Sequence, residues 1–217
     1  MLILKNINDF KNVTESYNIS ISESQLNQFQ KYHDFLIEWN KMINLISRQN
    51  ATTETILERH FLDSIVFLPE IEGLIKENPT ILDIGSGAGF PAIPLAIMKP
   101  NWNFTLSEAT LKKANFLNEL IKHLDLKNAR VENKRAEEIK NKYDFTTARA
   151  VAKIDELIKY SLPILKKGGS LLALKGPAYE EELKSAKDLI KSKKLKVEIF
   201  SKEVNGFSKK LVVLTQP

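Results

Sequence analysis

Hydrophobic residues recur at two different spacings along this chain, and the spacing changes near residue 79. Before that point, apolar side chains repeat every three or four positions, which is typical of amphipathic helices. After it, short apolar runs alternate with helical stretches, which is typical of βαβ units in a parallel sheet. The pattern therefore predicts a helical extension over residues 1–78 and an α/β domain over residues 79–217, packed together as one compact unit.

The helical extension contains three predicted helices after a weakly patterned start. Residues 1–21 indicate either a short helix or a loosely held arm. Ser22 and Gln25 have the spacing of a capping box, which marks the start of a long helix. Pro69 ends the second helix, because proline has no N–H to continue it. The predicted helices cover residues 26–46, 56–68 and 70–78.

The second half predicts seven strands, with helical stretches between most of them. No helical pattern separates the last two strands, so we expect them to pair as a hairpin with one strand antiparallel to the rest. The predicted fold class is α/β, a Rossmann-like fold with a mostly parallel seven-stranded sheet. The predicted strands are 80–84, 103–108, 129–133, 143–148, 170–174, 196–201 and 211–215, and the predicted helices are 91–99, 111–124, 135–138 (a short helix or turn), 154–165 and 180–192.

The first strand of this half runs into a turn with alternating glycines, Gly85, Gly87 and Gly89. Glycine allows positive φ and lets the backbone approach a ligand closely. Pro91 suits the first position of the helix that follows, where a missing N–H has no cost. A strand, a glycine turn and a helix N-terminus in this order are typical of a site for a nucleotide-like ligand.

Two ligands compete for this turn. The dinucleotide fingerprint is Gly-x-Gly-x-x-Gly. Counted from Gly85, its third glycine is replaced by Phe90; counted from Gly87, it is replaced by Ala92, which the fingerprint tolerates, so the dinucleotide alternative stays open. S-adenosylmethionine (SAM) has no pyrophosphate to bind but carries an ammonium and a sulfonium, for which Asp83 offers a carboxylate. The spacing of Asp83 and the glycines favours SAM, and a turn without any ligand is the third alternative.

Further candidates follow the other strands, because ligands of open α/β sheets bind at the carboxyl ends of the strands. Glu108 lies 19 positions after Gly89 and offers a carboxylate to the ribose hydroxyls. Ala136 and Glu137 follow the third strand, where we expect the adenine. Arg149 follows the fourth strand, facing the methyl group to be transferred. A positive charge is unfavourable beside a sulfonium, so Arg149 is better suited to bind a carboxylate or a phosphate. The alternative is that Arg149 is a surface arginine without a role in the site.

The residues that are missing narrow the chemistry. The chain has no cysteine, which excludes disulfides, thiolate zinc sites and the cysteine nucleophile of methylation at pyrimidine C5. The Asn/Asp-Pro-Pro-aromatic run that usually serves exocyclic amines is replaced by Ala148-Arg149-Ala150-Val151. Methylation of a ring nitrogen such as guanine N7 needs neither the cysteine nor the Asn/Asp-Pro-Pro-aromatic run, because the lone pair of N7 is free. Such a reaction mainly requires that N7 and the methyl group are positioned in line. The site is consistent with N7 chemistry without a general base or a metal.

Charge suggests the kind of partner. The net charge is +5, and residues 112–217 alone hold 24 basic and 14 acidic side chains, a net charge of +10. A basic half indicates a polyanionic partner, and a lysine-rich solvated surface is an equal alternative. No apolar run is long enough to span a membrane and the N-terminus lacks a secretion signal, so we expect a cytoplasmic protein without a membrane partner, monomeric by default.

Several polar residues are candidates for contact with a substrate. His60 and Asp63 lie three residues apart on one helix face. They are candidates for a substrate contact, but the favoured interpretation is a polar tether between the helices and the sheet. Lys175 ends the fifth strand and suits a phosphate, or is a plain exposed lysine. Lys209 and Lys210 precede the last strand and lie at the expected rim. The candidate substrate-binding residues are Arg135, His60, Lys175, Lys209 and Lys210.

Six runs occur in a characteristic order along the chain. They are Trp39-Asn40-Lys41-x-x-Asn44-Leu45, Arg59-His60-x-x-Asp63-Ser64, Asp83-Ile84-Gly85-Ser86-Gly87-Ala88-Gly89-Phe90-Pro91-x-Ile93-Pro94-Leu95-Ala96, Arg135-Ala136-Glu137, Ala148-Arg149-Ala150 and Ala173-Leu174-Lys175-Gly176. From about residue 22 to its end, the chain resembles the small-subunit ribosomal RNA guanine-N7 methyltransferases, known as the RsmG or GidB family. Two departures are Ser107-Glu108-Ala109, where the family usually has Leu-Asp-Ser, and Lys209-Lys210, near which it often has arginine.

The resemblance implies a SAM-dependent Rossmann-like fold with an N-terminal helical extension. It implies transfer of a methyl group to N7 of one guanine in 16S rRNA, with the rRNA or the small ribosomal subunit as partner. Carried onto matching positions, the cofactor contacts are Gly85, Phe90, Ala136, Glu137 and Arg149, with Glu108 at the ribose. The alternatives are a SAM-dependent methyltransferase of another RNA, a small molecule or a protein, and a non-enzymatic dinucleotide-binding module.

Overall fold

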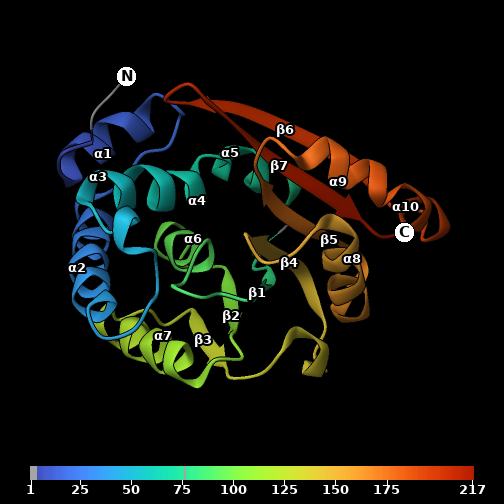
Figure 1. Ribbon diagram of the computed structural model, residues 1–217, viewed down its shortest axis with the longest axis horizontal. Coiled ribbons are helices and arrows are strands. Elements are labelled where there is room, and N and C mark those ends of the chain that lie inside the picture. Colours follow the sequence, from blue (N-terminus) through green and yellow to red (C-terminus); the bar gives the residue numbers. More distant parts are fainter. Residues whose placement is uncertain (1–3, 76) are drawn as a thin grey trace.

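The computed structural model describes residues 4–75 and 77–217, and its centre is one twisted sheet with helices packed on both sides (Figure 1). The strand order is β3-β2-β1-β4-β5-β7-β6. The strands β1 to β5 run parallel, whereas β7 is antiparallel to both β5 and β6. The strands are β1 (Thr80–Ile84), β2 (Asn103–Ser107), β3 (Ala129–Glu132), β4 (Tyr143–Arg149), β5 (Leu165–Lys175), β6 (Lys196–Val204) and β7 (Phe207–Thr215). The predicted Rossmann-like sheet with a terminal hairpin is confirmed.

The helices follow the predicted order with several changes of boundary. They are α1 (Ile7–Glu15), α2 (Glu23–Asn40), η1 (Arg48–Asn50), α3 (Thr53–Thr55), η2 (Ile56–Leu62), α4 (Asp63–Ile65), α5 (Leu68–Leu74), α6 (Ala92–Met98), α7 (Leu111–His123), η3 (Ala136–Glu138), α8 (Ile154–Ser161), η4 (Leu162–Ile164), α9 (Tyr179–Ser185) and α10 (Lys187–Ser192). Among helices of the described residues, none is long and apolar enough to cross a membrane.

The long helix α2 begins as predicted and ends earlier. The Ser22 hydroxyl accepts a hydrogen bond from the Gln25 amide, and the Gln25 side chain accepts one from the Ser22 amide, which completes the capping box. The predicted end at residue 46 is wrong. The Asn40 side-chain oxygen accepts hydrogen bonds from the amides of Leu45 and Ile46, at 2.9 and 3.0 Å, and these fold the chain back on itself.

The second predicted helix is one helical run from α3 through η2 to α4, and η2 is a π-helix. Pi-helical turns are rare and occur often at functional sites. Pro69 does not end this run but lies in the first turn of α5. The third predicted helix, 70–78, ends at Leu74, and its residue 76 lies outside the described residues, as do residues 1–3 of the weakly patterned start.

The C-terminal hairpin is longer than predicted. Asn205 and Gly206 have φ angles of 49° and 80° and form a two-residue turn between β6 and β7. Asn-Gly is a strong signal for this turn, because both positions need positive φ. The hairpin therefore includes residues up to Val204 and from Phe207, which the prediction left in a loop.

Two predicted helices before the hairpin also change. The strand β5 begins at Leu165, so the helix predicted over 154–165 is shortened to α8 and η4. The helix predicted over 180–192 is divided into α9 and α10.

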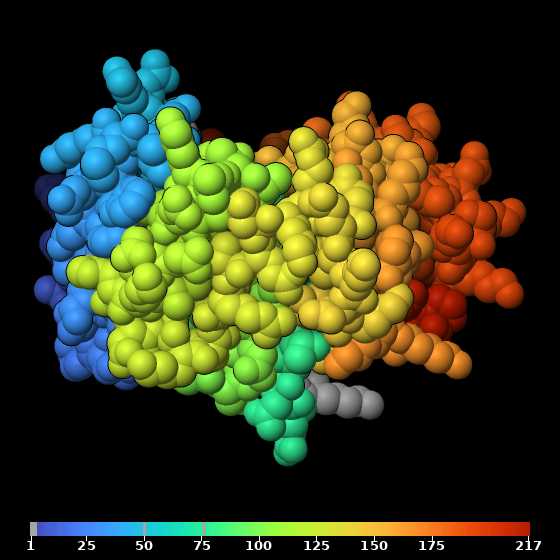
Figure 2. All heavy atoms as spheres, turned by 90° about the horizontal axis from the view of Figure 1, so that it is seen from below, coloured from blue at the N-terminus to red at the C-terminus, as the bar shows by residue number. Residues whose placement is uncertain are grey.

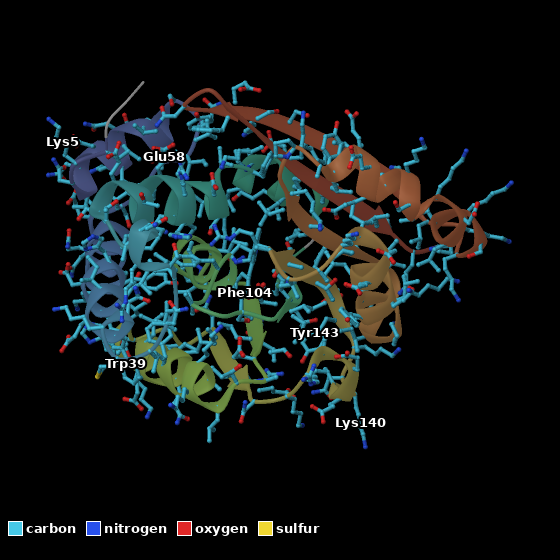
Figure 3. All side chains as sticks on the ribbon, in the orientation of Figure 1. Lys5, Trp39, Glu58, Phe104, Lys140 and Tyr143 are labelled. Atoms are coloured by element: carbon cyan, nitrogen blue, oxygen red, sulfur yellow. The ribbon has the colours of Figure 1, made fainter. Side chains whose placement is uncertain are left out.

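Two hydrophobic clusters cover the two faces of the sheet. The larger one joins the helical extension to the sheet through residues such as Phe29, Phe61 and Ile93, and the smaller one joins α8 to β5 and β7. In Figure 3, Phe104 lies in the interior whereas Lys5 and Lys140 point outward. Figure 2 shows the lower face, where α7, β3 and the following loop lie between the N-terminal helices and the C-terminal elements. The division of the chain into a helical extension over residues 1–78 and an α/β domain over residues 79–217 stays a prediction.

Candidate active site

Two adjacent hollows open at the carboxyl ends of the central strands. The smaller one has a volume of about 230 Å³ and is lined by residues that include Gly85, Glu108 and Ala136. The larger one has a volume of about 920 Å³ and is lined by Arg59, His60, Arg149, Lys175, Lys209, Lys210 and others. Val151, Ala152 and Glu156 line both hollows and form the wall between them. The expected switch point of the sheet, between β1 and β4, is therefore where the site lies.

The glycine turn follows β1, and of its three glycines Gly85 lines the smaller hollow, whereas Gly87 and Gly89 line neither hollow. All three glycines have positive φ, between 56° and 99°. At Gly89 a Cβ atom would lie 2.8 Å from the Ile93 side chain and 2.9 Å from the Tyr32 hydroxyl, so only glycine fits. At Gly87 there is space for a Cβ, and the backbone conformation alone requires glycine. Glycine is therefore required at position 89 by the lack of space and at position 87 by the backbone conformation.

Asp83 lies directly behind this turn and is fully buried. Its Oδ1 accepts a hydrogen bond of 2.7 Å from the Thr147 hydroxyl, while Oδ2 has no partner among the described residues. Burial raises the pKa of Asp83 to about 7, against hydrogen bonds and the Arg149 charge, which lower it. A buried carboxylate with an unpaired oxygen fits a cationic ligand bound against the turn.

Glu108 connects the turn to the end of β2. Its Oε2 accepts the Gly87 amide at 3.0 Å and its Oε1 accepts the Thr110 amide at 2.7 Å. Each carboxylate oxygen keeps a lone pair for a further donor, such as a ribose hydroxyl. The Glu108 side chain therefore reaches the turn from the end of β2.

The third strand contributes η3 to the smaller hollow. Ala136 is buried, Glu137 is exposed, and both line it. Arg135, predicted to bind substrate, also lines this smaller hollow and not the larger one. The structure therefore places Arg135 beside the cofactor candidates and apart from the other predicted substrate residues.

Arg149, His60 and Phe90 form a stack beside the larger hollow. The Arg149 guanidinium lies 4.8 Å from the centroid of the Phe90 ring, and the His60 ring stacks on the same phenylalanine at 4.9 Å and 16°. Arg149 Nη1 donates to the Arg59 carbonyl at 2.9 Å. Arg149 is thus held in place, and a free surface arginine is excluded. Phe90 is 5 % exposed and lines neither hollow, so the structure places it beneath the site.

Burial and positive neighbours keep His60 neutral. The pKa of His60 is lowered to about 3, first by burial and then by the charges of Arg149, Arg59 and Lys209. Burial also lowers the pKa of Arg149 from its ordinary value. An uncharged His60 does not compete with Arg149 for an anion, and its low pKa makes it a poor base near neutral pH.

The predicted lysines are engaged in contacts within the protein. Lys175 is 9 % exposed, pairs with Glu182 at 2.7 Å and donates to the Ala152 carbonyl at 2.7 Å. It is therefore neither a plain exposed lysine nor free to move. Lys209 pairs with Asp63 at 2.7 Å and joins β7 to α4, as the tether interpretation of Asp63 predicts. Lys210 lies 5.3 Å from the Tyr179 ring and donates to Ser201.

Sequence reasoning places Ala150 at this crevice but misses Val151, Ala152 and Glu156, which separate the two hollows. Ala150 has a φ of 56°, unusual for a residue with a side chain, and Val151 lies over Gly85. Glu156 is exposed and borders both hollows. Their residue types carry no local signal, because only the crossing of β4 beside β1 brings them to the glycine turn. Within the described residues, no group of three or more histidine, aspartate or glutamate side chains could hold a metal ion.

Comparison with known proteins gives relatives along most of the chain. A protein of Lactococcus lactis called ribosomal RNA small subunit methyltransferase G is 40 % identical over 191 residues, which cover 84 % of this chain and 78 % of that protein. A protein of the same name from Lactobacillus johnsonii is 41 % identical over 180 residues, covering 80 % and 74 %. The solved structure of magnesium protoporphyrin IX methyltransferase from Synechocystis is 12 % identical, with a TM-score of 0.56 over 72 % of this chain and 78 % of that one.

The structural likeness supports the fold alone, because its sequence identity is low. The sequence relatives and the family model go further, because the relatives cover most of the chain and the family model includes the glycine turn, the strand ends and most of the hairpin. The model described as rRNA small subunit methyltransferase G matches residues 25–212. This chain therefore belongs to the GidB family of small-subunit rRNA methyltransferases.

Proposed function

We propose that this protein transfers the methyl group of SAM to N7 of a guanine in the 16S rRNA of the small ribosomal subunit. Family membership supports the methyltransferase class and the rRNA substrate, since relatives at about 40 % identity have that name. The observation that carries the proposal is the pair of hollows with a shared wall. One is built on a glycine turn and carboxylates, and the other is bordered by cations.

The residues around the smaller hollow fit SAM. Gly85 lines the hollow, Glu108 is held by the Gly87 amide and offers acceptors to the ribose, and Ala136 and Glu137 border the place for the adenine. Asp83, whose Oδ2 is unpaired, adds a negative charge behind the turn when it is ionised. When bound, SAM supplies an electrophilic methyl group on a positively charged sulfur.

The larger hollow suits a nucleotide of an RNA strand. Its volume of about 920 Å³ is within the range of pockets that hold a ligand of this size. Arg59, Arg149, Lys153 and Lys209 border it, and cations in this arrangement bind phosphates. Arg149 lines this hollow and is fixed on Phe90, so it can hold a phosphate or a base edge without moving.

The reaction requires orientation more than proton transfer. Guanine N7 has a free lone pair and loses no proton on methylation, so no general base is needed. His60 accepts a hydrogen bond from Arg149 and has a pKa of about 3, which suits a positioning role. The chain's own work is to hold the base in line with the methyl group and to exclude water.

We further propose that the protein acts in the cytoplasm, as a monomer and without a metal, on 16S rRNA or on the small subunit. The basic C-terminal half supports a nucleic-acid partner. A SAM enzyme that acts on a small molecule or protein is the second candidate. It predicts turnover without RNA and little dependence on salt, whereas RNA binding weakens steeply as salt rises.

The test uses isotopically labelled SAM and small ribosomal subunits from a strain that lacks this enzyme. The RNA is digested after incubation and its nucleosides are identified by mass. We expect label in 7-methylguanosine with the unaltered protein and none with Gly87→Asp, because that change places a side chain and a charge in the turn. Label in no nucleoside, while SAM binding persists, would contradict the rRNA substrate.

A further inference from the structure

A half-exposed aromatic ring, that of Phe207, lies at the tip of the β6–β7 hairpin, 50 % exposed. The two-residue turn at Asn205 and Gly206 closes the hairpin, and Val204 pairs with Phe207 as the last rung of the ladder. The turn type matches the twist of the strands, so the ladder extends to the ring. The position of Phe207 is therefore set by backbone hydrogen bonding and not by burial of its side chain.

Two cations flank this ring. The guanidinium carbon of Arg59 lies 5.5 Å from the ring centroid, and Nζ of Lys209 lies 5.9 Å from it. Lys209 is two residues further along β7, on the same face of the strand, and Arg59 comes from the π-helix η2. Both cations also line the larger hollow. Phe207 consequently lies at the border of the proposed substrate site.

The charges next to the ring are only partly neutralised. Lys209 pairs with Asp63, but no ion pair joins Arg59 to a carboxylate in residues 4–75 and 77–217. A second pair of the same kind follows along β7, where Lys210 lies 5.3 Å from the Tyr179 ring and also lines the hollow. Rings interleaved with cations are how proteins bind single-stranded nucleic acid, with bases on the rings and phosphates at the cations.

We propose that Phe207 is a stacking platform for an unpaired RNA base next to the methylated guanine, with Arg59 at the adjoining phosphate. This inference rests on the proposed function. RNA is read mostly in loops whose bases can be unstacked. A guanine drawn into the larger hollow leaves its neighbour without a stacking partner, and drawing a base out of a stack is unfavourable. The exposed ring replaces the lost contact at the edge of the hollow.

A protein partner fits this ring less well. Protein interfaces are depleted of charge at their cores and bring several apolar side chains together. Ile199, the other large exposed apolar residue of the hairpin, is 43 % exposed and pairs with Val212. It lies about 16 Å along β6 from Val204, at ~3.3 Å per residue. The two side chains do not form one apolar patch, so Ile199 is a matched control for Phe207.

The experiment measures methylation of small subunits from a strain that lacks the enzyme, by unaltered protein, Phe207→Ala, Phe207→Trp and Ile199→Ala. For Phe207→Ala we expect the KM for subunits to rise about tenfold, the size of one lost base stack. SAM affinity by calorimetry and urea stability should not change. Phe207→Trp should restore the KM, and Ile199→Ala should behave as the unaltered protein.

Two outcomes would overturn the inference alone. One is a KM for Phe207→Ala within about twofold of the unaltered value, which is below the loss of a single stack. The other is an equal rise for Ile199→Ala, which would indicate a general effect of the hairpin. If the unaltered protein labels no RNA nucleoside, the proposed function fails and this inference fails with it. The measurement on the unaltered protein therefore distinguishes a failure of the proposed function from a failure of the inference about Phe207.

Discussion

Arg149 Nη2 donates a hydrogen bond to Nδ1 of His60 over 3.0 Å, and both side chains stack on Phe90. A guanidinium has no acceptor, so Nδ1 must accept and the proton of the neutral ring lies on Nε2. Protonation of His60 would break this bond and place two positive charges together. The arrangement of the site therefore depends on His60 staying neutral.

The first prediction concerns stability at acid pH. The folded pKa of His60, about 3, is below the ordinary value of 6.5, so the unfolded chain binds the extra proton between these two values. The stabilisation is complete above pH 6.5 and is lost as pH falls toward 3, at most about 1.4 kcal/mol per pH unit. His60→Asn keeps an acceptor near Nδ1 and should flatten this part of the profile. The measurement is the free energy of urea unfolding at pH 7.5, 5.5 and 4.5, and parallel curves for the two proteins would contradict it.

A second prediction separates the charge of Arg149 from its geometry. Arg149→Ala should lower kcat about 100-fold, because positioning over about 1 Å has effects of that size. Arg149→Lys keeps the charge but loses the fork that holds both the Arg59 carbonyl and His60, so it should recover only part of the rate. Single-turnover methylation of small subunits measures this. Wild-type rates in Arg149→Ala, with the fold intact by circular dichroism, would make Arg149 a bystander.

The third prediction concerns SAM affinity and pH. Asp83 is half-protonated near pH 7 because burial raises its pKa, and only the ionised form attracts a cation. SAM should therefore bind more tightly as pH rises from 5.5 toward 7.5, by at most about tenfold per pH unit below the pKa. Asp83→Asn still accepts from Thr147 and should remove this dependence. Calorimetric Kd values at several pH values test it, and the same slope in both proteins would assign the proton to another group.

The sequence predicts the central fold well because its signals are local or periodic. The strand-turn-helix at Gly85 to Pro91 needs no tertiary information, and the sheet follows from the alternation of patterns. The end of α2 was mispredicted because hydrophobic spacing continued to Ile46 while the Asn40 side chain turned the chain back. The Asn205-Gly206 pair is itself a local signal for the hairpin turn. The contacts of Lys175 and Val151 come from the sheet order, which no local pattern contains.

A fourth prediction compares two glycines of the turn. Gly89→Ala should lower the free energy of unfolding by about 2–4 kcal/mol, from crowding against Ile93 and Tyr32 together with strain at positive φ. Gly87→Ala meets only the strain and should lose about 1 kcal/mol. Urea unfolding of the two variants tests the difference. Equal losses would mean that the close packing at Gly89 relaxes without cost.

The last prediction assigns a role to Lys175. Its ammonium holds Glu182 and the Ala152 carbonyl, and Glu182 in turn accepts the Ile154 amide at the start of α8. Lys175→Met leaves a carboxylate that is only 20 % exposed without its cation, which is expected to destabilise the fold by about 3 kcal/mol. It should also lower kcat, because Ala152 belongs to the wall between the hollows.

The control for Lys175 is Lys166, which lies at the other end of β5 and pairs with Asp144 at 2.9 Å. Both partners of that pair are more than a third exposed, so Lys166→Met should cost at most about 1 kcal/mol and leave kcat unchanged. Urea unfolding and the KM and kcat for small subunits distinguish the roles. If Lys175 binds a phosphate of the RNA, Lys175→Met should raise the KM for small subunits without a change in stability. If Lys175 positions the wall between the hollows, Lys175→Met should lower stability and kcat together. Loss of stability with normal kcat would limit Lys175 to the fold.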